Sequence, residues 1–334
     1  MLDRRSLLAA APALLAGPAF AQAPQAPSRI STPEEAASFA RYIAGVKEDA
    51  RKKGISPEVL DRAFAGVHIA WRVIELDRNQ PEVKLTWEQY RTRIVSEQRI
   101  LRGREQLAKH RDLLLRVQDR FGVPPAIIIG LWGLESDYGR QMGGFNVVEA
   151  VATLAWEGRR ASFFRGELIA ALRILDAGDV TPGRMTGSYA GAMGQPQFMP
   201  SSYLRYAVDF EGNGRRDIWT SVPDVLGSIA NYLARSGWRA GECWGQPAIV
   251  PAGFDEYRAG RDNRLPLSEW TRLGVRPLGG RLAAPPNAQA AVLLPDGTGG
   301  EAFLAYGNFA AIRRYNPSDL YAIAIGLLGD QVVT

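Results

Sequence analysis

The chain has 334 residues, 46% of them hydrophobic, and carries 40 lysines and arginines against 35 aspartates and glutamates, a formal net charge of +5. This length and hydrophobicity allow roughly two domains with a large core, and they exclude a disordered or collagen-like chain. A single cysteine excludes an internal disulfide, and two histidines, His68 and His110, are too few for a Cys/His zinc cluster. Catalytic chemistry in this chain is therefore expected to rest on carboxylates.

Residues 1–21 have the pattern of an export signal. Arg4 and Arg5 precede an apolar stretch rich in alanine and leucine that ends in Ala19-Phe20-Ala21. The stretch is too short to stay in a bilayer, and the small residues at its end suit a signal peptidase. The paired arginines fit the twin-arginine route and also occur in Sec signals. We expect cleavage near Ala21, export to the periplasm and no membrane span in the remaining chain.

Residues 22–30 are expected to be a linker, and residues 31–120 an N-terminal helical region. Thr32-Pro33-Glu34-Glu35 combines an N-cap, a proline at the first helical position and an acid at the third, which predicts a helix start. Arg91–Arg116 holds eight Lys/Arg against three Asp/Glu. This excess fits either a solvated helix face or a basic strip that meets an anionic polymer.

One carboxylate falls on an apolar helical stripe. A helix that starts at Pro124-Pro125 has four residues on one side at steps of three, four and three: Ile128, Leu131, Glu135 and Tyr138. Burial raises a carboxyl pKa above its usual value of about 4.3, so Glu135 is expected to stay protonated near neutral pH, as a general acid requires. Asp137 points to the other side of this helix. The alternative is a buried glutamate neutralised by a structural arginine.

The composition changes after Trp238. Most of the later glycines and prolines lie in residues 240–306, where short apolar runs flank the hairpin signal Pro295-Asp296-Gly297-Thr298-Gly299. This predicts a small β-rich insertion over residues 240–311. Residues 312–334 regain a helical pattern and are expected to return to the helical body.

A loop after residue 208 resembles an EF-hand in its spacing. Side-chain oxygens occupy positions 1, 3, 5 and 9 of such a loop, a glycine occupies position 6, and position 7 can offer its backbone carbonyl: Asp209, Glu211, Asn213, Asp217, Gly214 and Arg215. Position 12 is Thr220 in place of the usual glutamate, and Asp224 could close the site. The loop is either a structural Ca²⁺ site or a metal-free turn held by side-chain to backbone hydrogen bonds.

Several motifs together resemble the lytic murein transglycosylase B family, periplasmic enzymes that cleave the glycan strands of peptidoglycan. They follow the family's order along residues 38 to 330: Phe121–Pro125, Gly130–Gly139, Ala152–Ala155, Gly158–Arg160, Phe163-Phe164, Gly187–Ser202, Asp217–Trp219 and Arg313–Asn316. The segment Gly187–Ser202 is the most specific of these.

The resemblance implies a mainly α, α+β fold with a lysozyme-like helical core over residues 121–239. It places Glu135 as the single catalytic acid and base. Groove and C-terminal site residues are expected at Ser188, Gln197, Phe198, Tyr315, Asn316 and Tyr321, with the tail folded back over the cleft. The aromatic residues Trp132, Tyr138, Phe198 and Tyr203 suit stacking on sugar rings.

The implied reaction is non-hydrolytic cleavage of the β-1,4 bond between N-acetylmuramic acid and N-acetylglucosamine, with a 1,6-anhydro product. The expected partner is peptidoglycan, with no nucleic acid, and no cofactor is required beyond a possible structural Ca²⁺. A hydrolytic muramidase acting on the same bond and a non-catalytic peptidoglycan-binding scaffold are the alternatives. A scaffold has no need for the desolvated acid at Glu135.

Overall fold

The structure, a computed structural model, describes residues 29–79 and 85–334. The expected signal segment 1–21 and nearly all of the expected linker 22–30 lie outside the described residues. The longer helices are α1 (Pro33–Lys52), α2 (Pro57–Ala63), α3 (Trp71–Arg78), α4 (Trp87–Ile94), α5 (Glu97–Lys109), α6 (Arg111–Phe121), α7 (Pro125–Ser136), α8 (Val147–Glu157), α9 (Ala161–Asp176), α10 (Pro200–Tyr206), α11 (Val222–Arg235), α12 (Leu267–Arg272), α13 (Gly307–Tyr315) and α14 (Asp319–Val333).

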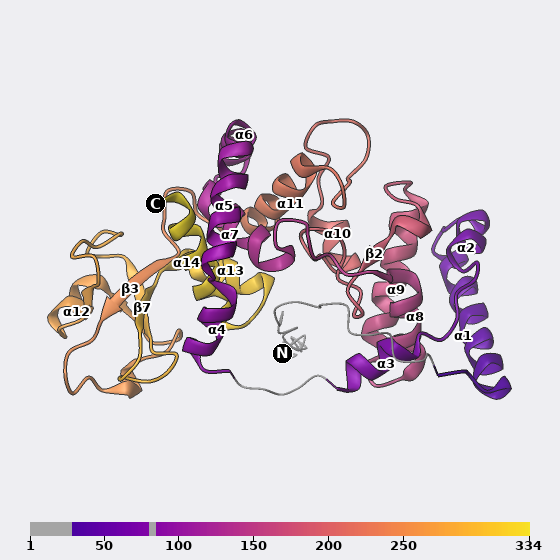
Figure 1. Cartoon of the computed structure of the whole chain (residues 1–334), viewed down its shortest axis with the longest axis horizontal. Coiled ribbons are helices and arrows are strands. Elements are labelled where there is room, and N and C mark those ends of the chain that lie inside the picture. Colours follow the sequence, from indigo (N-terminus) through magenta and orange to yellow (C-terminus); the bar gives the residue numbers. More distant parts are fainter. Residues whose placement is uncertain (1–28, 80–84) are drawn as a thin grey trace, which may run out of the picture.

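The strands are short and form two sheets. They are β1 (Phe145–Asn146), β2 (Thr186–Gly187), β3 (Gly245–Ile249), β4 (Arg264–Pro266), β5 (Arg276–Pro277), β6 (Gln289–Leu293) and β7 (Ala302–Ala305). β1 pairs with β2, and the other five strands form an antiparallel sheet in the order β4-β6-β7-β3-β5. This sheet and α12 lie at one end of the molecule, and α1 and α2 lie at the other end (Figure 1).

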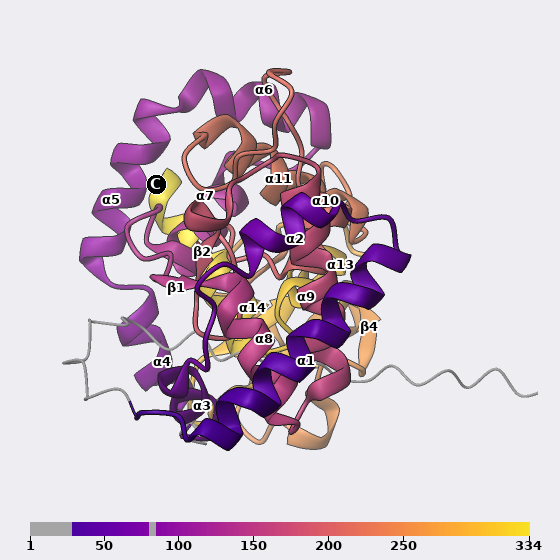
Figure 2. The ribbon, with the colours of Figure 1, turned by 90° about the vertical axis from the view of Figure 1, so that its right-hand side faces the viewer.

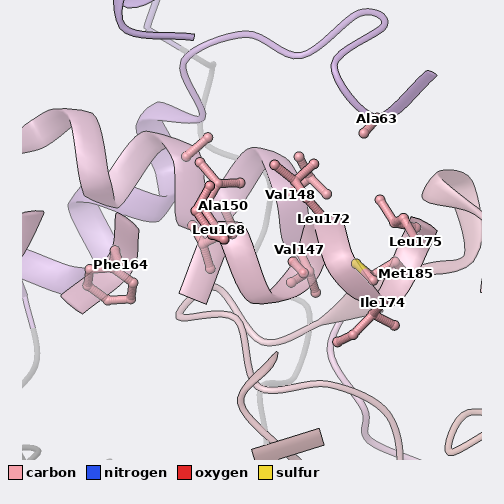
Figure 3. Packing of buried hydrophobic residues seen from close by; sticks show 14 of the residues in the cluster. Ala63, Val147, Val148, Ala150, Phe164, Leu168, Leu172, Ile174, Leu175 and Met185 are labelled. Atoms are coloured by element: carbon pink, nitrogen blue, oxygen red, sulfur yellow. The ribbon is translucent and has the colours of Figure 1, made fainter. Parts of the chain in front are cut away.

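The helices α8 and α9 are the centre of one hydrophobic cluster. Apolar residues of α9 at helical spacing, such as Leu168, Leu172 and Leu175, are buried with Val147 and Val148 of α8 (Figure 3). The first three helices join the same cluster, and α1 crosses in front of α8 and α9 in Figure 2. The helix start predicted at Thr32 is confirmed, because Thr32 and Glu35 form a reciprocal capping box.

The helices α7 and α14 approach each other very closely, although they are almost two hundred residues apart in the chain (Figure 1). Glycines allow this approach: a Cβ on Gly130 would lie 2.5 Å from the Ile325 carbonyl oxygen, and one on Gly329 would clash with the Ala126 carbonyl. The second hydrophobic cluster surrounds this pair and includes α4, α6, α11 and α13. The C-terminal helix is therefore part of the core that holds α7.

The loop between β6 and β7 connects the sheet to the helical body. Asp296 in this loop accepts hydrogen bonds from the backbone N–H groups of Trp87 (2.7 Å) and Glu88 (3.1 Å), so it caps α4 from more than two hundred residues away. Glu301 accepts from the Trp87 indole and pairs with Arg91, both at 2.5 Å. These contacts fix the position of α4, which carries Tyr90.

The predicted fold class is confirmed: the structure is mainly helical, with an N-terminal helical region and a small β-rich insertion. The hairpin predicted around residues 295–299 is also confirmed, since β6 and β7 pair antiparallel on either side of it. The N-terminal helices do not form one unit, because α1–α3 and α4–α6 belong to different hydrophobic clusters. Within the described residues, we find no helix long and apolar enough to cross a bilayer.

Half of the eight cations in the basic segment Arg91–Arg116 form ion pairs with acids: Arg91, Arg99, Arg102 and Arg116. Arg102 pairs with Asp137 and Arg116 with Glu211, at 2.8 and 3.0 Å. Leu101 in this segment is 51% exposed. The paired arginines connect α4, α5 and α6 to neighbouring elements. The other four cations, Arg93, Arg104, Lys109 and Arg111, form no ion pair with a residue in 29–79 or 85–334.

Candidate active site

Glu135 lies in the last turn of α7 and is only partly exposed. Its Oε1 accepts a short hydrogen bond from the Tyr321 hydroxyl of α14. No lysine, arginine or histidine of the described residues lies within 4 Å of its carboxylate, so the alternative of a glutamate neutralised by a structural arginine is wrong. The close packing of α7 on α14 is what brings the tyrosine to this carboxyl.

Burial sets the protonation of Glu135. Desolvation raises its pKa from 4.5 to about 7, and the hydrogen bond from Tyr321 counteracts part of that rise. A carboxyl with a pKa near neutral is present in both forms at physiological pH. It can therefore give a proton and take one back, as a residue that serves as acid and then as base must do.

The backbone turns sharply after Glu135 and moves the next acid away. Asp137 ends α7 in a left-handed conformation (φ 50°), and Tyr138 follows at φ 60°. The Asp137 carboxylate pairs with Arg102 at 2.8 Å and lies 4.0 Å from Arg99. The prediction that Asp137 is no close partner of Glu135 agrees with this pairing.

The Glu135 carboxylate raises the pKa of four tyrosine hydroxyls, which come from four different helices. Burial is the main cause that raises the pKa of each hydroxyl, and the Glu135 carboxylate raises it further; for Tyr232 the pKa reaches about 12. The four are Tyr90 of α4, Tyr232 of α11, Tyr315 of α13 and Tyr321 of α14. The Tyr321 hydroxyl donates to the Glu135 carboxylate, whereas the hydroxyls of Tyr232 and Tyr315 donate to backbone carbonyls. Tyr315 and Tyr321 were predicted from the sequence, and Tyr90 and Tyr232 were not.

Nothing in the local sequence distinguishes the two missed tyrosines. Tyr90 lies on a short helix whose position depends on the distant Asp296 cap, and Tyr232 lies on the buried face of α11. The Tyr232 ring is tilted against that of Tyr315, with ring centres 4.4 Å apart, and its hydroxyl donates to the Arg314 carbonyl. Their proximity to Glu135 depends on tertiary contacts.

The segment Gly187–Phe198 forms a tight loop that is fastened to α7 and α13. Gln195 accepts a hydrogen bond from the Trp132 indole (2.8 Å) and donates to the Trp219 carbonyl (2.9 Å). The Tyr315 hydroxyl donates to the Pro196 carbonyl at 2.5 Å. Gln195 is thus a buried link between the loop and α7 that the sequence analysis also missed.

Two predicted groove residues lie in this loop. Ser188 accepts a hydrogen bond from the Ala192 N–H, which agrees with a loop-capping role. Gln197 has a left-handed backbone (φ 53°), and its amide nitrogen donates to the carbonyls of Met142 (3.0 Å) and Gly194 (2.8 Å). Its Oε1 receives no hydrogen bond from the part of the chain that the structure describes. A strained residue with a free acceptor is a feature common at binding sites.

Several aromatic residues expected at the groove are core residues. Trp132, Tyr138 and Tyr203 are buried, so the prediction that they stack on sugars is wrong. Tyr138 lies beyond the end of α7 and donates to the Arg99 carbonyl, which takes it off the stripe of Glu135. Phe198 is 1% exposed and lies against Tyr315 and Tyr232, both 5.7 Å away between ring centres.

The C-terminal residues return to the site as expected. Tyr315 ends α13, Asn316 follows it and accepts a hydrogen bond from the Ser318 N–H, and Tyr321 lies in the first turn of α14.

Two cavities, of about 450 and 530 Å³, are lined by residues other than these predicted site residues.

In the predicted cation loop, the carboxylates of Asp209 and Asp224 accept hydrogen bonds from backbone N–H groups of the loop. Asp209 accepts from the N–H groups of Gly212, Asn213 and Gly214 at 2.6–3.0 Å. Asp224 is buried, and its two oxygens accept from the Phe210 and Asp217 N–H groups. Its carboxylate therefore does not close an ion site.

The remaining predicted ligands are engaged elsewhere. Glu211 pairs with Arg116, and the Asn213 side chain accepts from the Arg215 N–H. In residues 29–79 and 85–334 no three His, Cys, Asp or Glu side chains converge as a metal site. The residues as arranged do not fit a calcium ion, and the metal-free turn describes the loop better.

Residues 38–330 match the family described as "Transglycosylase SLT domain", which covers most of the chain. The chain belongs to the lytic transglycosylase family. Its members are enzymes that cleave the glycan strands of peptidoglycan.

Known relatives of this lytic transglycosylase include the membrane-bound lytic murein transglycosylase B of Escherichia coli (strain K12). The two are 37% identical over 256 residues, which is 74% of this chain and 67% of the relative. SltB3 from Pseudomonas aeruginosa, solved in complex with NAG-anhNAM-pentapeptide, is 45% identical, with a TM-score of 0.85 over 88% of this chain and 79% of SltB3. Escherichia coli Slt35, solved in complex with calcium, is 32% identical, with a TM-score of 0.75 over 92% and 96%.

The hydrogen bond from Tyr321 gives a direct test of the site. In Tyr321→Phe we expect the pKa of Glu135 to rise further above its usual range, because the donor that favours the carboxylate is gone. The alkaline limb of the pH–rate profile should move to higher pH, and the maximal rate should fall about tenfold. Tyr306→Phe is the matched control, since its hydroxyl bonds to Gln246 in the β-rich insertion. An unchanged profile in Tyr321→Phe would contradict this role.

Proposed function

We propose that the enzyme cleaves the β-1,4 bond between N-acetylmuramic acid and N-acetylglucosamine without water and leaves a 1,6-anhydro end, with Glu135 as acid and then base. The observation that carries this proposal is the Glu135 carboxyl: its pKa is raised to about 7, it is bonded to Tyr321, and it has no cationic partner among the described residues. Glycosidases normally use two carboxylates, the second as nucleophile or as activator of water. Here the next acid in the sequence, Asp137, forms an ion pair with Arg102.

In the first step Glu135 donates its proton to the glycosidic oxygen. The bond from that oxygen to C1 of the muramic acid breaks, and its electron pair stays on the leaving oxygen. The positive charge that develops at C1 can be stabilised by the N-acetyl oxygen of the same sugar. Glu135 is now a carboxylate, and the Tyr321 hydroxyl donates to it.

In the second step the Glu135 carboxylate takes the proton of the C6 hydroxyl of the muramic acid. The C6 oxygen bonds to C1, the anhydro ring closes, and the protonated acid is restored without consumption of water. No step requires a cation. A pKa of about 7 suits both steps, since neither protonation state is strongly favoured near neutral pH.

The remaining predicted site residues are proposed to hold the substrate. The free acceptor of Gln197 and the hydroxyl of Ser188 are suited to the N–H and hydroxyl groups of an N-acetyl sugar. Tyr315 and Asn316 lie where the C-terminal segment meets the Gly187–Phe198 loop. Phe198 is proposed as a positioning residue, because it contacts the Tyr315 ring while being buried itself.

The site of action is proposed to be the periplasm. The support is the export pattern of residues 1–21 together with relatives named for murein. SltB3 has also been solved in complex with NAG-NAM-pentapeptide, and we propose the same class of substrate here.

Product analysis tests the reaction. Purified sacculi digested with the enzyme in heavy-oxygen water should release muropeptides with anhydro ends, one water lighter than reducing ends and without the heavy isotope. Mass spectrometry distinguishes the two products. Reducing ends that carry the heavy oxygen would show a hydrolytic muramidase and overturn the proposal.

A further inference from the structure

A cavity of about 530 Å³ lies outside the candidate active site, between the C-terminal end of α1, the helix α9 and the helix α10. It shares no lining residue with the site around Glu135. Its polar lining consists of four cations and two hydroxyls: Lys53, Arg165, Arg173, Arg205, Ser162 and Ser201. Among the described residues that line it there is no aspartate or glutamate.

Two of these cations are compensated by nearby acid. Arg165 forms an ion pair with Asp49 and lies 5.6 Å from the Tyr42 ring centre, so its position is fixed. The charge of Lys53 also acts on Asp49. Arg173 and Arg205 are exposed, and neither forms an ion pair with a residue in 29–79 or 85–334.

Two acids of α9, Glu167 and Asp176, form no ion pair with Arg173 or Arg205 and accept hydrogen bonds from serines instead. Glu167 of α9 is buried, and its oxygens accept from the Ser201 N–H (2.8 Å) and hydroxyl (2.7 Å). Asp176 accepts from the N–H and hydroxyl of Ser56. The charged groups of the lining are therefore all cations, and its two unpaired guanidinium groups offer partners to an anion.

We propose that this cavity binds carboxylate groups of the peptide stems of peptidoglycan, at a place separate from the bond that Glu135 attacks. The inference rests on the proposed function, since it takes peptidoglycan as the substrate. A pentapeptide stem ends in a free carboxylate, and two guanidinium groups offer forked donors that match carboxylate geometry. Ser162 adds a hydroxyl, and Ile169 and Leu204 in the lining add an apolar surface for the stem.

Binding to sacculi with and without stems tests the proposal. The full chain carrying Glu135→Gln binds without cleaving, so sedimentation with intact sacculi and with amidase-treated strands gives two affinities. Arg173→Glu with Arg205→Glu should weaken binding to intact sacculi about tenfold and leave binding to denuded strands unchanged. Arg276→Glu with Arg281→Glu is the matched control: it changes the net charge equally, at exposed arginines of the β-rich insertion.

Three results would overturn the proposal: no loss of binding with the cavity variant, an equal loss on denuded strands, or an equal loss with the control variant.

A competition experiment identifies the source of the anion. Free stem pentapeptide should displace the protein from intact sacculi at concentrations where inorganic phosphate does not, and equal displacement by phosphate would overturn the assignment to stems. Failure of the proposed function would show separately, as an absence of anhydro products from wild-type digests, and would not alter these binding comparisons.

Discussion

Glu135→Gln is expected to lower the rate of anhydro-muropeptide release from purified sacculi by at least about a thousandfold. Glutamine keeps the shape of the side chain and can still accept the hydrogen bond from Tyr321, but it has no proton to give and cannot take one. Because the same group serves in both proposed steps, its loss affects each of them. The large effect therefore comes from the chemistry and leaves the fold intact.

Glu167→Gln provides the matched control for this experiment. Glu167 is also a buried glutamate on a helix, and it accepts two hydrogen bonds from Ser201, away from Glu135. The control should retain most of the wild-type rate. If Glu135→Gln kept more than a tenth of that rate, with a native circular dichroism spectrum, Glu135 would not be the acid and base of this enzyme.

Glu135→Gln is also expected to make the protein more stable than the wild type in alkaline solution. Burial raises the pKa of Glu135 from 4.5 to about 7, which means that the folded state holds this proton more tightly than the unfolded state. At about 1.4 kcal/mol for each pH unit between the two pKa values, the ionised side chain costs the folded state about 3 kcal/mol. Glutamine carries no charge and does not incur this cost.

Because the Glu135 pKa is higher in the folded state than in the unfolded state, the stability difference between the two proteins depends on pH. Below about pH 4.5 the carboxyl is protonated in both states, and the two proteins should be equally stable. As the pH rises from about 4.5 to about 7, the unfolded wild type ionises first and wild-type stability falls relative to the variant. Above about 7 the difference should stay constant at about 3 kcal/mol.

Urea unfolding at about pH 4 and about pH 8 measures this difference. Asp262→Asn is a suitable control, because the Asp262 side chain is 90% exposed and its charge needs no desolvation. A stability difference between wild type and Glu135→Gln that is the same at both pH values would show that the carboxyl is not desolvated. The raised pKa would then be no basis for the acid role.

The local features of the helices could be predicted from the sequence because they depend on neighbours in the chain. The capping residues at Thr32 and the apolar periodicity of the helices act within a few residues. The desolvation of Glu135 was also predictable, since apolar residues surround it in the sequence, and its pKa in the structure is raised as expected. The specific motif Gly187–Ser202 indicated the family, and residues 38–330 match that family.

The loop after residue 208 shows why ligand spacing alone is insufficient. The sequence places oxygen atoms at the right intervals for calcium, but a carboxylate can serve either an ion or backbone N–H groups. In the structure Asp209 accepts from N–H groups of its own loop. Asp224 lies on α11 and accepts from the Phe210 and Asp217 N–H groups, so its contacts depend on how the loop packs against this helix.

The surroundings of Glu135 were decided by tertiary contacts between distant segments. Tyr321 reaches Glu135 because Gly130 and Gly329 let α14 pack directly on α7, and Tyr90 is placed by a helix whose N-terminus is capped by Asp296. The chain by itself determined that Glu135 would be desolvated, since its apolar neighbours are adjacent in sequence. Which hydroxyls surround that acid, and which aromatic residues lie in the core instead, follows from long-range packing that no local pattern encodes.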